Sequence, residues 1–130
     1  MPAPDSFETS RLTAERLRAD HFEELDRFHQ DRDVMATLGG PRDAARTRRF
    51  LEDNLAHWDR FGFGIWVLRD RDGQAFAGRA ALRHVEIGGQ DEIELAYALM
   101  SAFWGRGLAT EVARACLDLG FGVLGLDDLV

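Results

Sequence analysis

The sequence contains no lysine, because all 16 basic residues among its 130 are arginine. This absence excludes a lysine nucleophile, a Schiff base and the lysine of a Walker-type phosphate loop. Cysteine is almost absent too: Cys116 stands alone, which excludes an internal disulfide and favours a reducing, cytoplasmic compartment. No run approaches the roughly 18 apolar residues of a membrane span. The first ten residues lack the basic start and apolar core of a signal peptide.

Positive charge is also scarce, since 23 acidic residues outnumber the basic ones and the formal net charge is −7. Nucleic acid binding needs a basic surface, so no direct nucleic acid partner is expected. An acidic surface suits a cationic or amine-bearing partner, although it is also common in proteins that are simply soluble. No spacing of cysteine, histidine and carboxylates indicates a metal site. The length and ordinary composition predict one globular domain over residues 1–130.

The N-terminal half shows helical signals after one weakly alternating strand, predicted at residues 11–18. Asp20 and Glu23 have the spacing of a capping box, which predicts that a helix begins there. A short helical turn is expected at residues 34–38, and Gly-Gly-Pro at 39–41 then interrupts the chain.

A longer amphipathic helix is predicted from that break to about residue 60, because Leu51, Leu55 and Trp58 recur with helical spacing. Its polar side is expected to be a solvated face that carries Arg42, Arg46, Arg48 and Arg49.

The apolar period changes to two after residue 62, which predicts three antiparallel strands at 64–70, 75–85 and 92–99. Asp-Gly at 72–73 predicts a two-residue hairpin turn, and Gly-Gly at 88–89 predicts a second turn. The last of these strands places two glutamates and two alanines on one face, namely Glu92, Glu94, Ala96 and Ala98.

A last helix is predicted from Gly107 to about Leu119, with Leu108, Val112 and Cys116 in its apolar stripe. Cys116 is therefore expected to be a packed thiol and not a nucleophile. A turn should follow at 120–125, and residues 126–130 (LDDLV) look like the start of another strand.

Glycines cluster just before that helix, where Gly105 and Gly107 flank Arg106. A glycine-rich loop that enters a helix N-terminus presents free N–H groups to an anion, for which a pyrophosphate is a natural ligand. The dinucleotide motif lacks its third glycine here, and a Walker loop would need lysine. A plain glycine turn remains the alternative.

Residues 94–111 read ELAYALMSAFWGRGLATE and closely resemble the central signature of the GNAT acetyltransferase superfamily. Tryptophan at position 104 is typical of the branch that contains the ribosomal-protein N-terminal alanine acetyltransferases. Weaker similarities extend the resemblance over essentially the whole chain. It implies an α/β (α+β) GNAT fold, with a mixed, mostly antiparallel sheet flanked by helices.

The resemblance also implies acetyl-CoA as cosubstrate. Six consecutive residues match the loop whose backbone N–H groups hold the pyrophosphate: Gly105, Arg106, Gly107, Leu108, Ala109 and Thr110. Residues 97–100 match the strand end along which pantetheine binds, so Ala98, Leu99 and Met100 are further candidates. A backbone N–H near Ala98 or Leu99 would polarise the thioester carbonyl.

The implied reaction is direct attack of a primary amine, of a protein N-terminus or a small molecule, on the thioester. Free amines are mostly protonated at neutral pH, so a general base is required. Glu94 occupies the glutamate position of the motif, and its strand face leaves room for a substrate. The alternatives are a surface glutamate or one paired with Arg79 or Arg83. Glu92 is a weaker candidate base, and His84 a candidate proton relay.

The sequence stops at Val130, where the resemblance implies a further helix and two strands. We therefore expect a C-terminally incomplete domain, or one whose sheet a partner chain completes, with a homo-oligomer as one form. A non-catalytic acyl-CoA-binding or interaction module, or an inactive fragment, is the alternative to an N-acetyltransferase.

Overall fold

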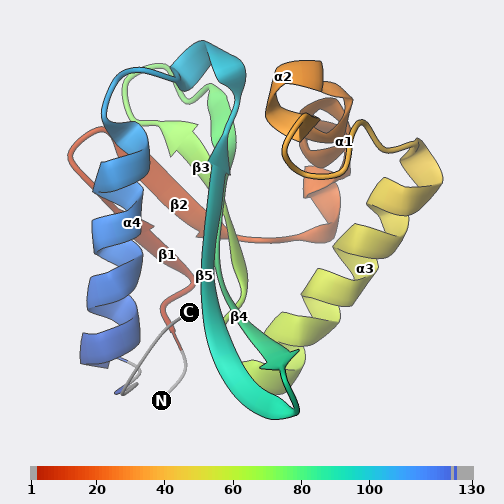
Figure 1. Cartoon of the computed structure of the whole chain (residues 1–130). Helices are drawn as coiled ribbons and strands as arrows, with labels where there is room; N and C mark the ends of the chain where they lie inside the picture. Colours follow the sequence, from red (N-terminus) through yellow and green to blue (C-terminus); the bar gives the residue numbers. More distant parts are fainter. Residues whose placement is uncertain (1–2, 124, 126–130) are drawn as a thin grey trace.

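The computed structural model describes residues 3–123 and 125, and a five-stranded sheet forms its centre. Neighbouring strands follow each other in sequence order, and every described pair is antiparallel. The strands are β1 (Ser6–Glu8), β2 (Leu12–Arg16), β3 (Ile65–Asp70), β4 (Phe76–Ile87) and β5 (Gln90–Leu99). Figure 1 shows helices α1 to α3 on one face of this sheet and α4 on the other.

The helices α1 (Phe22–Gln30) and α2 (Arg32–Met35) follow a single 3-10 turn. The capping box predicted at Asp20 and Glu23 is wrong, because Asp20 lies inside that turn. His21 does the capping: its Nδ1 accepts the Arg18 N–H at 2.9 Å. The helical turn predicted at 34–38 begins earlier, where the side chain of Asp31 caps α2.

The long helix α3 (Ala44–Phe61) confirms the predicted amphipathic segment. Asp43 begins it by accepting the Arg46 N–H at 2.8 Å, and Gly62 ends it in a left-handed conformation. Leu51 and Trp58 from the predicted apolar stripe are buried, so the helix packs through the face that the spacing predicted.

The strands largely follow the predicted alternation, with two corrections. The short strand β1 was not predicted, because three residues carry too little periodicity to detect. The two-residue hairpin at Asp72-Gly73 is wrong, since residues 71–75 separate β3 from β4. The turn at Gly88-Gly89 is confirmed, and both glycines have positive φ values, 58° and 79°.

Helix α4 (Leu108–Asp118) closes the second face of the sheet over β5 and β4. Its stripe of Leu108, Val112 and Cys116 is buried as predicted. Burial raises the pKa of the Cys116 thiol to about 12, which keeps it protonated and unreactive at neutral pH. A single π turn, Leu119–Val123, follows. The strand expected at 126–130 lies outside the described residues.

Candidate active site

The connection from β5 to α4 contains two glycines with left-handed backbone. The φ angle is +77° at Gly105 and +75° at Gly107, a region that residues with a side chain rarely adopt. A Cβ atom at Gly105 would meet nothing within 4 Å, so the space beside the loop is open. The backbone conformation therefore favours glycine at both positions. This reason is separate from the one that the sequence suggested, which was to let an anion approach the backbone N–H groups.

The backbone N–H groups of this loop are unpaired over a continuous stretch. From Gly105 to Thr110, none of the six donates a hydrogen bond to another of the described residues. The first N–H groups of a helix lack intrahelical acceptors, and Gly107, the N-cap of α4, extends that set backwards. These donors and the positive end of the helix dipole suit an anion with several oxygens, such as a diphosphate.

Arg11 and Glu111 hold the loop against the turn between β1 and β2. Glu111 accepts hydrogen bonds from the Arg11 N–H and Nε, both at 2.9 Å, and from the Thr9 hydroxyl. Arg11 Nη1 donates to the Arg106 carbonyl at 2.7 Å. Burial opposes ionisation of Glu111, but the bonds from Thr9 and Arg11 outweigh it and lower its pKa. Nothing local in the sequence signals this anchor, whose partners lie about 100 positions apart.

A first hollow, which we call the loop hollow, lies beside this loop and encloses about 260 Å³. Its lining includes Leu38 before α3, residues 97–99 at the end of β5, and Trp104 and Ala109 around the loop. Trp104 is 51% exposed, and its Nε1 donates to the Leu99 carbonyl at 2.9 Å. The indole is therefore held at the strand end as part of the wall.

The backbone at the end of β5 distinguishes the three candidates there. Met100 donates its N–H to the Ala77 carbonyl at 2.8 Å and accepts the Phe103 N–H at 2.9 Å, so both groups are occupied. N–H groups alternate in direction along an antiparallel ladder. The Leu99 N–H therefore points away from β4, at the edge of the described sheet, and the Ala98 N–H points toward β4.

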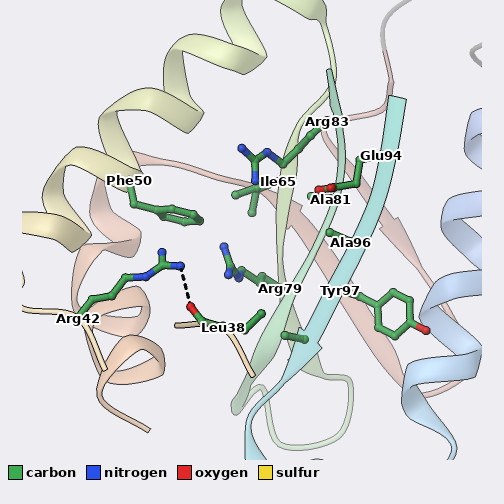
Figure 2. Close-up of a pocket in the computed structure, with 11 residues that line it drawn as sticks. Leu38, Arg42, Phe50, Ile65, Arg79, Ala81, Arg83, Glu94, Ala96 and Tyr97 are labelled. Carbon is green, nitrogen blue, oxygen red and sulfur yellow. Dashed lines mark hydrogen bonds between the residues drawn. The ribbon is translucent and has the colours of Figure 1, made fainter. Parts of the chain in front are cut away.

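A second hollow, which we call the arginine hollow, encloses about 220 Å³ between α3 and the sheet. Figure 2 shows Arg79 and Arg83 from β4, Glu94 and Ala96 from β5, and Arg42 and Phe50 around it. Strand register places Arg83 opposite Glu94 and Arg79 opposite Ala98. The two hollows share Leu38, Tyr97 and Ala98, so they meet at the end of β5.

Glu94 points into the arginine hollow (Figure 2). The ion pair with Arg79 or Arg83 that the sequence left open does not form, and the hydrogen bond drawn in Figure 2 joins Arg42 to Leu38 instead. Glu92 and His84 are absent from both linings. The His84 ring stacks on Phe61, with its Nε2 3.3 Å from Asp91 Oδ1.

Arg42 was expected on the solvated face of α3, and this is wrong. It precedes the N-cap of that helix, and its backbone N–H donates to the His29 carbonyl at 3.0 Å, which turns the residue over α1. Its half-buried side chain reaches the arginine hollow. Arg46, Arg48 and Arg49, which lie within α3, are exposed as expected.

Two further observations concern the described residues as a whole. They contain no group of three histidine, cysteine or acidic side chains arranged to hold a metal ion. None of their helices combines the length and the apolar character needed to cross a bilayer. A cytoplasmic location stays a prediction of the sequence.

Comparison with known proteins gives a matching family model and several similar proteins. The sequence model of the acetyltransferase (GNAT) domain matches residues 11–130. The uncharacterized protein YkkB of Bacillus subtilis strain 168 is 30% identical over 118 residues, which cover 86% of this chain and 69% of that protein. An acetyltransferase from Agrobacterium tumefaciens strain C58 is 28% identical with a TM-score of 0.83, covering 99% of this chain and 73% of its own.

Two more distant structures share the fold. A spermidine N-acetyltransferase from Vibrio cholerae, in complex with CoA and spermine, has a TM-score of 0.73 at 18% identity, covering 92% of this chain and 69% of its own. RimL, a ribosomal L7/L12 alpha-N-protein acetyltransferase, has a TM-score of 0.71 at 16% identity, covering 96% and 66%. The resemblance stated from the 94–111 motif is thus confirmed, and the chain belongs to the GNAT acetyltransferase family of acyltransferases.

Proposed function

We propose that this protein transfers the acetyl group of acetyl-CoA to a primary amine, with Glu94 as the general base. The observation that supports this most is the unpaired carboxylate of Glu94 in a hollow that meets the loop hollow at Ala98. An acyl donor and an amine could thus approach each other from opposite sides of one strand end. The acceptor is a small amine or a protein N-terminus.

The loop hollow fits the donor. The unpaired N–H groups of residues 105–110 would hold the diphosphate, and the open space at Gly105 would admit its oxygens. The edge of β5 at 97–99 would accompany the pantetheine arm. When bound, acetyl-CoA supplies a thioester: a C–N bond forms at its acetyl carbon, the C–S bond breaks, and the thiol leaves with a proton. The CoA and spermine in the Vibrio cholerae enzyme support this pairing of ligands.

Glu94 and Leu99 would contribute in different ways. An amine with a pKa of about 8 to 10 is mostly protonated at neutral pH, so Glu94 would accept its proton, directly or through one water. The outward N–H of Leu99 would donate a hydrogen bond to the oxygen on which negative charge develops. Ala98 lies where the hollow of Glu94 meets the loop hollow, and its side chain is too small to block the passage between them.

The experiment compares Glu94→Gln with Glu92→Gln in a thiol-release assay against amines and N-terminal peptides. Glutamine keeps the shape but cannot accept the proton, so we expect kcat/KM to fall about 10²- to 10⁴-fold for Glu94→Gln. Glu92, on the same strand but outside both linings, is the matched control and should change little. CoA affinity, measured by calorimetry, should be unchanged in both.

Equal loss in the two variants, or none in either, would contradict the role of Glu94. A wild-type protein that binds CoA but releases no thiol with any acceptor would instead be a binding module. Completion of the sheet by a second copy stays a prediction. A measurement of molar mass in solution, such as light scattering, can check it.

A further inference from the structure

The arginine hollow contains a concentration of positive charge that the protein itself does not neutralise. Arg42, Arg79 and Arg83 approach it from just before α3 and from two positions on β4. Figure 2 shows the guanidinium groups of Arg42 and Arg79 pointing toward each other, with that of Arg83 farther along the same hollow. None of the three forms an ion pair with a carboxylate of residues 3–123 or 125. This local excess contrasts with the net charge of −7 for the whole chain.

Several other arginines in the same fold form ion pairs with carboxylates. Arg69, for example, contacts Glu15 at 2.7 Å and Glu24 at 2.6 Å, and Arg11 pairs with Glu111 at 2.9 Å. Carboxylates are abundant in this chain, so scarcity does not explain why the three arginines in the hollow lack them. Glu94 is the single carboxylate in the lining, and it stays unpaired although Arg83 is its cross-strand neighbour.

The arrangement is costly in the free protein. The Nε atoms of Arg42 and Arg83 are buried without a hydrogen-bond partner. Burial, followed by the charges of Arg42 and Arg83, lowers the pKa of Arg79 to about 10. Like charges close together repel, and desolvated charges without partners destabilise a fold. A bound group of opposite charge would offset the repulsion among the guanidinium groups and the burial of their charge.

Packing alone accounts for only part of the arrangement. The Arg79 guanidinium lies 4.6 Å from the Phe50 ring centroid and 5.0 Å from that of Phe28, which are favourable cation–π contacts. These contacts hold Arg79 in place, but they satisfy neither buried Nε atom nor the repulsion among the three. Guanidinium groups match the geometry of carboxylate and phosphate oxygens, with paired N–H donors.

The cluster lies beside the point where the two hollows meet. Arg79 is opposite Ala98, which belongs to both linings, and Arg83 is opposite Glu94. A molecule whose amine lies between Glu94 and Ala98 would thus carry its neighbouring atoms into the arginines. The enclosed 220 Å³ corresponds to about seven water molecules, at about 30 Å³ each, which suits a small molecule or one to two residues.

On this basis we propose that the acceptor carries a negatively charged oxygen group, a carboxylate or a phosphate, close to its amine, and that Arg42, Arg79 and Arg83 bind that group. The inference rests on the proposed acetyltransferase function and names the substrate class of the same site. It also excludes polyamines as preferred acceptors, because a second positive charge in this hollow would meet three arginines. The amine is acetylated while the anionic group stays unchanged and fixes its orientation.

The first test measures kcat/KM for matched acceptors: an α-amino acid, its amide, its decarboxylated amine, phosphoethanolamine and spermidine. Charge-assisted hydrogen bonds to arginine predict at least a tenfold preference for an anionic acceptor over its uncharged counterpart. The amino acid and phosphoethanolamine arms distinguish carboxylate from phosphate. Amines and amides that react as well as their anionic counterparts would overturn the inference while leaving the transferase function intact.

The second test uses Arg79→Met, which keeps the length and apolar stem of the side chain. We expect this variant to lose the preference through a KM at least ten times higher for the anionic acceptor, with little change for its amide. Arg48→Met is the matched control, because Arg48 also lies over an aromatic ring, 3.9 Å from the Phe22 centroid, but outside the hollow. An equal loss for anionic and neutral acceptors would indicate a merely structural role and overturn the inference.

The third test needs no turnover. The product analogue N-acetylalanine should raise the thermal midpoint of the wild-type protein, and its uncharged methylamide should not. Arg79→Met should abolish this difference. Its own midpoint should change little, because the loss of an unpaired buried charge offsets the loss of the two cation–π contacts. No difference between the two analogues in the wild type would overturn the inference. If CoA binds and the analogues differ, but no acceptor releases thiol, the proposed function fails and the anion site stands.

Discussion

The loop hollow and the arginine hollow meet at Ala98, yet the chain builds them by different means. The donors of the first are backbone N–H groups of six consecutive residues, held by two left-handed glycines. The donors of the second are side chains from separate segments, at positions 42, 79 and 83. A site made of backbone is local, uncharged and independent of pH, whereas a site made of side chains depends on tertiary packing and carries charge.

The largest expected consequence of this difference concerns pH and His29. The His29 ring is fully buried behind the arginine hollow, 2.7 Å from the Thr47 hydroxyl, and its Nε2 is 3.4 Å from Arg42 Nη1. Burial, followed by the charges of Arg79, Arg42 and Arg46, lowers its pKa from 6.5 to about 4. The unfolded chain therefore binds a proton at pH values where the folded protein does not, and the free energy of unfolding falls as pH falls below 6.5.

Between pH 7 and pH 5 this group alone should remove about 2 kcal/mol of stability. Urea unfolding of the wild type and of His29→Gln measures it, because the variant should lose about 2 kcal/mol less over that range. His21 and His57 are present in both proteins, so their titration cancels in the comparison. Parallel pH curves for the two proteins would show that the arginines do not suppress protonation of His29.

The next largest expected effect comes from a substitution that disrupts the backbone N–H groups of the loop hollow. Gly107→Glu places a side chain at φ +75° and a negative charge beside the N–H groups, so the CoA dissociation constant should rise about 10- to 100-fold. Gly89→Glu is the matched control, because Gly89 has φ +79° and open space for a side chain but lies in the turn between β4 and β5. Calorimetry with CoA compares the two, and equal affinities would refute the assignment of the loop.

The smallest expected effect concerns Arg106 and tests whether backbone or side-chain charge dominates the loop hollow. Arg106 belongs to the loop, but its side chain is exposed and lies over the Phe103 ring, 5.3 Å from the centroid. Salt screens exposed charges, so Arg106→Ala should weaken CoA binding less than about threefold at physiological ionic strength. The same titration measures it. A tenfold loss would mean that side-chain charge, and not backbone, dominates this hollow too.

The loop could be predicted from sequence because its information is contiguous. Glycine at positions 105 and 107 and the apolar stripe of α4 are readable in one window, and so is the alternation of β5. Elements with short-range signals, such as α3 and the Gly88-Gly89 turn, were likewise predicted. The strand β1 was missed because it exists through its pairing with β2. The Asp20 cap was wrong because the helical turn begins earlier, at Arg18, whose N–H is accepted by His21.

The arginine hollow could not be predicted in the same way. Arg79 and Arg83 were named from the sequence only as possible partners of Glu94, and both line the hollow with it. Arg42 was assigned to solvent, because helical spacing says nothing about a residue just before the helix begins. What brings it inward is a backbone bond to His29, 13 residues earlier. The Arg11–Glu111 anchor is similar, since opposite charges 100 positions apart have no detectable relation in one sequence.

Trp104 gives the molecule a built-in optical reporter. Trp58 and Trp66 are 2% and 0% exposed, whereas Trp104, at the wall of the loop hollow, is 51% exposed. A dissolved quencher such as iodide would therefore reduce the emission of Trp104 and leave that of the other two almost constant. Any molecule that fills the loop hollow would shield this ring, so occupancy could be followed in unlabelled protein by light alone.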